Sequence, residues 1–269
     1  MLNILLPTDF SVNAQKAIDY AVRLFEKEEC IFYVLHAYHD APSDVKTKAD
    51  LENDLKHLVE ILSEKKQNQK HLFKSVFLIE SVVNALNITM MDKAIDYTFM
   101  GNKGVSSLFN VFMGSNTVRA ISQLDSGPII AVPTDYDCDP PEEIVFANNF
   151  KHRFITAELT PLIKLTKLWD STLSVVHISS EKALEKTQKQ NQKALKLALK
   201  ELRTRFSEVQ LEVSITSSLY TLGKENKKIG MIALFKTKHG FLENLFHEPV
   251  VRKMTFNTEV PLLILPEIA

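Results

Sequence analysis

MGNKGVSSLFNVFMGSNT, residues 100–117, holds three of the chain's seven glycines. Glycine loses more backbone entropy on folding than other residues, so a chain that uses it sparingly places it where the backbone requires it. Gly101 and Gly104 allow a tight loop whose amides can approach a ligand. Gly114-Ser115 would open a helix whose free N–H groups form an anion site. From the glycines alone, a structural turn and a phosphate-binding loop are both open interpretations.

The stretch differs from two familiar phosphate-binding loops. It lacks the GK[ST] ending of a Walker A loop. A dinucleotide-binding GxGxxG would follow the first strand, where the turn Pro7-Thr8-Asp9 contains no glycine. Lys103 could still supply a positive charge to a phosphate, and Ser115 and Thr117 could supply hydroxyl donors.

Apolar strands and helical spacing alternate on both sides of this stretch. The sequence predicts strands over 3–7, 31–37, 73–79, 97–101 and 128–132, with helices between them. Parallel strands need crossover helices, so this alternation predicts a parallel α/β sheet. Ligands of such sheets bind beyond the carboxyl ends of the strands, where the chain reverses its direction of progression. If the first and fourth strands are neighbours, the turns 7–9 and 100–104 face the same crevice.

The chain repeats this pattern once. Three segments of the first half return in the same order in the second half: NILLPTDF (3–10) as EIVFANNF (143–150), YVLHAY (33–38) as SVVHIS (174–179), and GPIIAVP (127–133) as VPLLILP (260–266). We therefore predict two domains of similar fold, 1–136 and 142–269. The joint DYDCDPPEE (135–143) is rich in acidic and proline residues, which suits an exposed linker.

The composition excludes several classes of protein. A hydrophobic content of 45% and a charged content of 24% are those of a globular chain, and a formal net charge of −1 argues against a general nucleic-acid or membrane-surface binder. We expect no signal peptide, because MLNILLPTDF (1–10) has too short an apolar run and no basic residue, and no membrane span, because no apolar run reaches about 18 residues. Cys30 and Cys138 form no CxxC pair, which disfavours a disulfide framework or a zinc site and fits a reducing cytoplasm.

The spacing Gly101-x2-Gly104-x9-Gly114-Ser115 resembles the G-2x-G-9x-G-(S/T) motif of ATP-binding universal stress proteins. ILLPTDFSVNAQKAIDYA (4–21) resembles that family's first strand, acidic turn and first helix, and YVLHAY and GPIIAVP are similar to later segments of it. The resemblance covers the whole first repeat and, more faintly, the second. The chain thus resembles a tandem universal stress protein.

The resemblance implies a fold and a ligand. The implied fold is two tandem Rossmann-like (adenine nucleotide α-hydrolase-like) domains, each a five-stranded parallel sheet in order 3-2-1-4-5 flanked by helices. The implied ligand is ATP, with or without Mg²⁺, held between the turns after strands one and four. Asp9 would contact the nucleotide, and Ala37 and Met100 would lie against the adenine. The implied binding residues are Pro7, Thr8, Asp9, Ala37, Met100, Gly101, Lys103, Gly104, Gly114, Ser115, Asn116 and Thr117.

The second repeat has lost the motif. A constant offset of 133 residues aligns the motif positions Gly101, Gly104, Gly114 and Ser115 with Leu234, Thr237, His247 and Glu248. A glutamate repels phosphate, and Pro249 next to it lacks a backbone donor. We therefore predict that the second repeat does not bind ATP. The pair His239 and His247 lacks further ligands and is not predicted to hold a metal.

The run over residues 181–205 is rich in lysine and glutamate. It is expected to be a solvated helical face, because Leu195, Leu199 and Leu202 keep a core stripe.

The function expected from this combination is that of an ATP-binding universal stress protein acting in stress response as a nucleotide-dependent binding or regulatory module. No GxSxG elbow, Walker pair or poised base is present, so no catalytic residue is predicted. Two alternatives stay open: a slow ATPase, and a scaffold whose site is vestigial or takes AMP or another ligand. Expected partners are an adenine nucleotide and either intramolecular pairing of the repeats or a homodimer, with no nucleic acid and no membrane.

Overall fold

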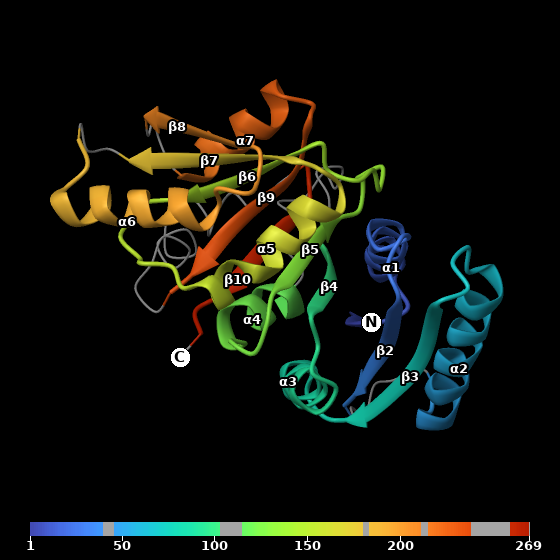
Figure 1. The fold of residues 1–269 in the computed structure, drawn as a ribbon. Helices are drawn as coiled ribbons and strands as arrows, with labels where there is room; N and C mark the ends of the chain where they lie inside the picture. Colours follow the sequence, from blue (N-terminus) through green and yellow to red (C-terminus); the bar gives the residue numbers. More distant parts are fainter. Residues whose placement is uncertain (40–45, 103–114, 180–182, 211–214, 238–258, 269) are drawn as a thin grey trace. The chain divides into compact units, whose positions relative to one another are not determined.

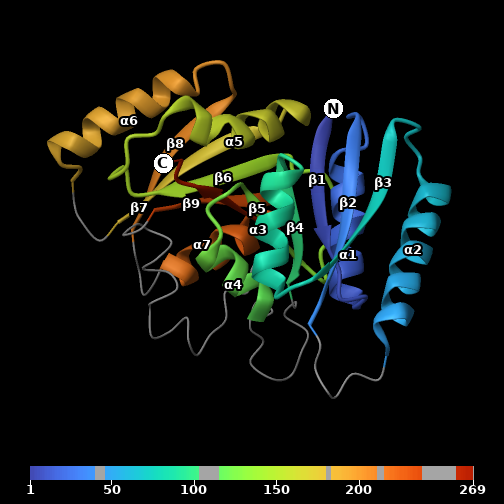
Figure 2. The same ribbon diagram turned by 90° about the horizontal axis from the view of Figure 1, so that it is seen from below.

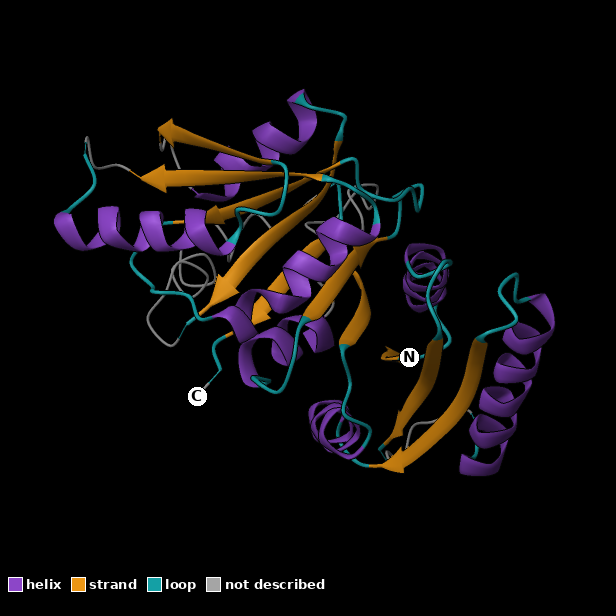
Figure 3. Cartoon of the chain, viewed as in Figure 1, coloured by secondary structure: helices purple, strands orange, loops and turns teal. Residues whose placement is uncertain are grey.

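The computed structural model describes residues 1–39, 46–102, 115–179, 183–210, 215–237 and 259–268 (Figure 1). The chain forms two compact units. The described part of the first is 1–39, 46–102 and 115–134, and that of the second begins at residue 135. In both units strands alternate with helices (Figure 3). None of the helices within the described ranges is both long and apolar enough to span a membrane.

The first unit is a parallel sheet in the order β3-β2-β1-β4-β5, as the family resemblance implies. Its elements are β1 (Leu2–Pro7), α1 (Val12–Leu24), β2 (Cys30–Tyr38), α2 (Lys48–Lys65), β3 (His71–Ile79), α3 (Val82–Asp92), β4 (Tyr97–Asn102), α4 (Ser115–Gln123) and β5 (Ile129–Pro133). Helices α1 and α3 lie on opposite sides of β1 and β4 (Figure 1), and α2 lies beside β3 (Figure 2).

Local sequence explains these elements. Strands β1 and β2 are almost continuously apolar because both faces of a parallel sheet are covered by helices. Helix α1 begins where the Ser11 hydroxyl accepts a hydrogen bond from the Ala14 amide, so Ser11 is its N-cap. Its buried side chains recur at helical spacing: Ala14, Ala17, Ile18, Ala21 and Leu24.

The second unit repeats the topology, with strand order β10-β9-β6-β7-β8. Its elements are β6 (Glu143–Asn148), α5 (Thr156–Leu168), β7 (Thr172–Ser179), α6 (Lys186–Ala198), β8 (Thr204–Gln210), α7 (Ile215–Glu225), β9 (Ile229–Lys236) and β10 (Leu262–Pro266). Read from β8 to β10 and numbered within the unit, this order is again 3-2-1-4-5. The predicted α/β class and strand order therefore hold for both halves.

Two expectations about segment ends were wrong. Helix α6 ends at Ala198, and Leu202, expected on a core stripe running to 205, lies beyond it and is half-buried. Glu143, expected in the exposed linker, is the first residue of β6 and is buried. Its carboxylate accepts hydrogen bonds from Ser174 Oγ (2.5 Å) and Asn226 Nδ2 (3.0 Å), which is why a charged residue can lie there.

Candidate functional site

The carboxyl ends of β1, β2 and β4 meet at one edge of the first sheet. Pro7 pairs with Leu35 of β2, and Leu5 pairs with Thr98 of β4. Continuing the second register puts Pro7 level with Met100. The chain runs outward from β1 to β2 and β3 and then returns to β4 on the other side of β1, so this edge is the sheet's switch point.

The backbone of the turn after β1 is held by hydrogen bonds to β2 and to the Thr8 side chain. The Thr8 amide donates to the Leu35 carbonyl (2.8 Å), and the Thr8 hydroxyl accepts from the Phe10 amide (2.9 Å). His36 Nδ1 lies 2.8 Å from the Thr8 carbonyl oxygen, and since a carbonyl only accepts, Nδ1 carries the proton. The Phe10 ring packs on His36 with centroids 4.8 Å apart. No role for His36 was predicted from the sequence. The one hint was that His177 occupies the matching position of the second repeat.

Asp9 presents an exposed carboxylate at this edge. Its Oδ1 accepts a hydrogen bond from the Ser11 amide (3.0 Å), so one oxygen also serves the entry into α1. Asn149, its counterpart in the second unit, makes the same bond to the Lys151 amide (3.0 Å). The hydrogen bond at the helix entry therefore does not require the negative charge of Asp9. No group of three potential metal ligands occurs among the described residues.

The end of β4 is packed closely against α1. A Cβ atom at Gly101 would lie 2.3 Å from the Asn13 carbonyl oxygen, so only glycine fits there. The Gly101 carbonyl accepts from Thr117 Oγ1 (3.0 Å), which ties the first turn of α4 to the end of β4. Asn102 is buried, and its Oδ1 has no hydrogen-bond partner among the residues that the structure describes.

The predicted site residues fall into two groups. Nine lie on the described segments around this edge: Pro7, Thr8, Asp9, Ala37, Met100, Gly101, Ser115, Asn116 and Thr117. Met100, Thr8 and Thr117 are buried, Ala37 is half-buried, and Asn116 is exposed. Ser115 begins α4. Lys103, Gly104 and Gly114 lie outside the described residues.

The strand registers correct the alignment of the two repeats. Asn102 pairs with Pro133 on β5, and Lys236 pairs with Pro266 on β10. The proline positions differ by 133 residues, but those on β4 and β9 differ by 134. The counterpart of Gly101 is therefore Phe235, not Leu234, because the chain between β9 and β10 is one residue shorter than the chain between β4 and β5.

Phe235 belongs to an aromatic cluster of Phe146, His152, Phe154 and Phe235. Its ring centroid lies 4.5 Å from that of His152 and 4.8 Å from that of Phe154, and its side chain is 4% exposed. The loop that supplies these partners is longer than its counterpart: α1 begins two residues after Phe10, whereas α5 begins six residues after Phe150. Aromatic side chains thus fill the place where the first unit has a glycine.

Polar side chains close the same edge of the second unit from two helices. Glu158 of α5 is buried and lies 3.0 Å from His152 Nε2. From α6, Gln188 Nε2 donates to the Asn149 carbonyl (2.8 Å) and Asn191 Nδ2 to the Phe150 carbonyl (2.9 Å). These contacts fix the loop after β6 and leave its backbone carbonyls bonded within the unit.

A family profile described as universal stress protein family matches residues 1–133. A search of curated proteins with this sequence found no match.

Among solved structures, a universal stress protein from Archaeoglobus fulgidus DSM 4304 is similar over 98% of both chains, with 14% identity and a TM-score of 0.74. A putative universal stress protein from Pseudomonas aeruginosa UCBPP-PA14 is similar over 98% of this chain and 92% of its own, with 10% identity and a TM-score of 0.61. A universal stress protein solved in complex with cAMP covers 49% of this chain and 97% of its own, with 16% identity and a TM-score of 0.38. Because the first two structures are only 14% and 10% identical to this chain, their similarity to it is a similarity of fold.

Proposed function

We propose, from the match of residues 1–133 to the universal stress protein family, that the first unit binds ATP beyond the carboxyl ends of β1 and β4. The observation that carries the proposal is the meeting of the β1 turn, the end of β4 and the start of α4 at the switch point of the sheet. Occupancy of this site would alter the protein's conformation or partners during stress, which makes it a regulatory module.

The residues at this edge fit an adenine nucleotide. Met100 and Ala37 are the proposed apolar contacts of the base, and the first turn of α4, with the exposed Asn116, offers donors to phosphate oxygens, while Thr117 Oγ1 holds that turn against the Gly101 carbonyl. Gly101, Lys103, Gly104, Gly114 and Ser115 complete the proposed phosphate loop. Pro7 and Thr8 shape the first turn, whose exposed carboxylate, Asp9, suits a nucleotide hydroxyl or a phosphate-bound Mg²⁺.

The second unit is proposed to bind no nucleotide. The aromatic cluster fills the counterpart of the Gly101 position, and α6 binds the backbone of the turn that matches Pro7-Thr8-Asp9. A ligand that binds this turn would have to displace the buried Gln188 and Asn191 side chains, which would then lose their hydrogen bonds. The second unit is thus proposed to serve as a structural or regulatory partner of the first.

Calorimetric titration with ATP tests the proposal. We expect about one ATP per chain, with thermal stabilisation of about 2.7 kcal/mol when ATP is present at 100 times its dissociation constant. Asp9→Asn is the informative variant, because Asn149 shows that an asparagine keeps the helix-entry bond. We expect weaker ATP binding from this variant and an unchanged fold.

Gly114→Val should abolish ATP binding, and Gly223→Ala in α7 is its control, since a Cβ there meets nothing within 4 Å. Unchanged affinity in both Asp9→Asn and Gly114→Val would contradict the site. ATP turnover that the Gly114 substitution removes would instead make the protein a slow ATPase. Absence of any thermal shift with ATP would favour a scaffold or another ligand.

A further inference from the structure

Helix α6 carries a line of lysines on its exposed side. Its sequence, KTQKQNQKALKLA, contains four lysines and no acidic residue. With Lys200 just beyond its end, the lysines are spaced alternately by three and four residues, which places them in one row along a helix. The lysine stripe consists of Lys186, Lys189, Lys193, Lys196 and Lys200, all exposed. The opposite side, with Gln188, Asn191 and Leu195, is buried.

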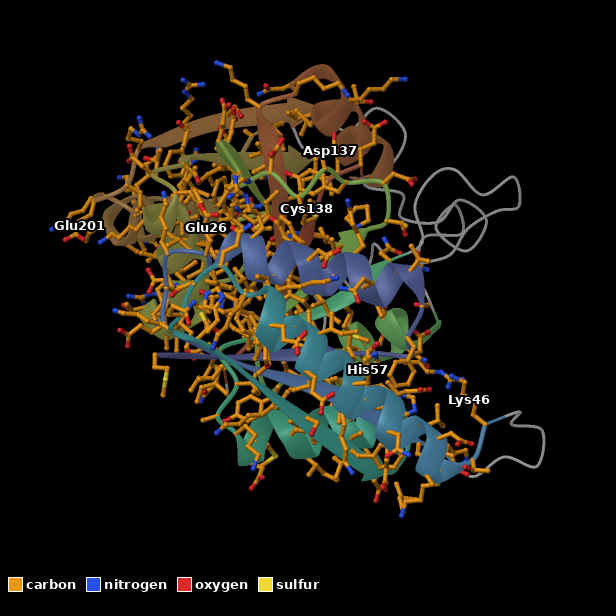
Figure 4. The ribbon with its side chains drawn as sticks, turned by 90° about the vertical axis from the view of Figure 1, so that its right-hand side faces the viewer. Glu26, Lys46, His57, Asp137, Cys138 and Glu201 are labelled. Atoms are coloured by element: carbon orange, nitrogen blue, oxygen red, sulfur yellow. The ribbon has the colours of Figure 1, made fainter. Side chains whose placement is uncertain are left out.

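No salt bridge joins the lysine stripe to an acidic side chain among the described residues; Lys200 interacts only through its charge with neighbouring Glu201. Glu201, which follows α6 (Figure 4), pairs with Lys167 (2.8 Å). Lys196 Nζ lies 4.8 Å from the ring centroid of Phe206 on β8, a contact that leaves its charge unneutralised. Like charges three and four residues apart weaken a helix, so the stripe does not help α6 to fold.

The helix at the same place in the first unit is different. Helix α2, between the second and third strands of its sheet, carries Lys48, Lys56 and Lys65 among five acidic residues, and Lys48 pairs with Glu52 (3.7 Å). The fold therefore does not demand a purely basic helix at this position. The near-zero net charge of the whole chain, from which no membrane contact was expected, conceals this local excess.

The exposed Leu197 indicates which kind of partner the lysine stripe would bind. It is 68% exposed and lies one turn from both Lys193 and Lys200. A convex helix touches a flat surface along a line, so a row of ammonium groups with one apolar side chain suits a bilayer with anionic headgroups. Nucleic-acid phosphates would satisfy the lysines but offer nothing apolar to Leu197. We propose that α6 binds the surface of an anionic lipid bilayer.

Vesicle flotation of the full chain tests this proposal. We expect binding to phosphatidylcholine vesicles that contain 30% phosphatidylglycerol, no binding to pure phosphatidylcholine vesicles, and loss of binding in high salt. The triple variant Lys186→Gln/Lys189→Gln/Lys193→Gln should bind roughly a hundredfold more weakly, since each lysine near such a surface contributes about a factor of five. Leu197→Gln should weaken binding with its salt dependence unchanged.

The matched control is Lys48→Gln/Lys56→Gln/Lys65→Gln on α2, which removes the same charge elsewhere and should bind like the parent. Circular dichroism of each variant checks that it is folded. Equal losses in the two triple variants, or no binding to the anionic vesicles, would overturn the proposal. So would tighter binding of the stripe to a 20-base-pair DNA duplex than to the vesicles, which would make nucleic acid the partner. ATP titration of the same variants should be unaffected, which separates this inference from the nucleotide site.

Discussion

At the scale of single residues, Gly101 has a role that the sequence could not reveal. The glycine was interpreted as room for a ligand, yet a Cβ atom there would collide with the backbone of α1 at Asn13. Glycine at this position is thus required for helix–strand packing, whatever the ligand does. This close approach is between α1 and β4, which lie about 90 residues apart in the chain, so no local sequence pattern can predict it.

This packing predicts opposite effects for two glycine-to-alanine substitutions. Gly101→Ala should destabilise the protein by about 1–3 kcal/mol, because its methyl group must push α1 away. Gly223→Ala, inside α7 with open space around it, should stabilise it by about 0.5–1 kcal/mol through helix propensity. Urea unfolding of both variants measures the difference, and equal effects would contradict the packing.

The two cysteines should differ in reactivity. Burial raises the pKa of the Cys30 thiol to about 12, so very little thiolate forms at neutral pH. Cys138, in the segment between β5 and β6 (Figure 4), is half-buried. A thiol reagent such as DTNB should modify Cys138 in the native protein and Cys30 only after unfolding. In Cys138→Ser, fast labelling of the native state should disappear; labelling that persists would show that Cys30 is accessible.

At the scale of elements, the strands were the most predictable features. All five strands predicted for the first repeat lie within two residues of their observed ends, because buried parallel strands are continuous apolar runs. The register of β9 was missed by one residue, since the offset was taken from the prolines at the two ends of the last strand of each repeat and the intervening chain differs in length. The insertion carrying His152 and Phe154 gave no periodic signal, so the cluster that closes the second unit appeared only in three dimensions.

His71, the first residue of β3, should make the stability of the protein depend on pH. Burial lowers the pKa of His71, against the opposing effect of the Phe25 and Glu28 carbonyls. The unfolded chain therefore takes up this proton first, near pH 6.5, so the stabilisation is complete above that pH and is lost as the pH falls toward the folded pKa. His71→Gln should flatten the fall in unfolding free energy between pH 7.5 and pH 5.5.

His57→Gln is the control for this effect, because the His57 side chain on α2 is 74% exposed. Urea unfolding at several pH values should give this variant the same pH dependence as the parent chain. If His71→Gln kept the full slope, another group would have to be responsible for it.

At the scale of the whole molecule, the two units share a topology but differ at the edge where a ligand would bind. The sequence predicted this contrast from the lost glycines, and the described residues add a physical reason in the aromatic cluster and the amide contacts from α6. The proposal of ATP comes from the family match of residues 1–133 and from the spacing of the loop over 101–117.

The contrast predicts that changes in the second unit leave nucleotide binding intact. Phe235→Ala should destabilise the protein by about 3–5 kcal/mol, because it leaves a cavity in the aromatic cluster. Its ATP affinity and stoichiometry, measured below its unfolding temperature, should equal those of the parent. Loss of ATP binding by the folded variant would place the second unit in the site.

The stoichiometry of ATP on the intact chain tests the central claim most directly. Native mass spectrometry of the parent, Asp9→Asn and Gly114→Val, each with saturating ATP, reports the number of nucleotides per chain. We predict about one for the parent and a loss of the bound species in Gly114→Val. Two nucleotides per chain, none, or one that both substitutions leave in place would contradict the account.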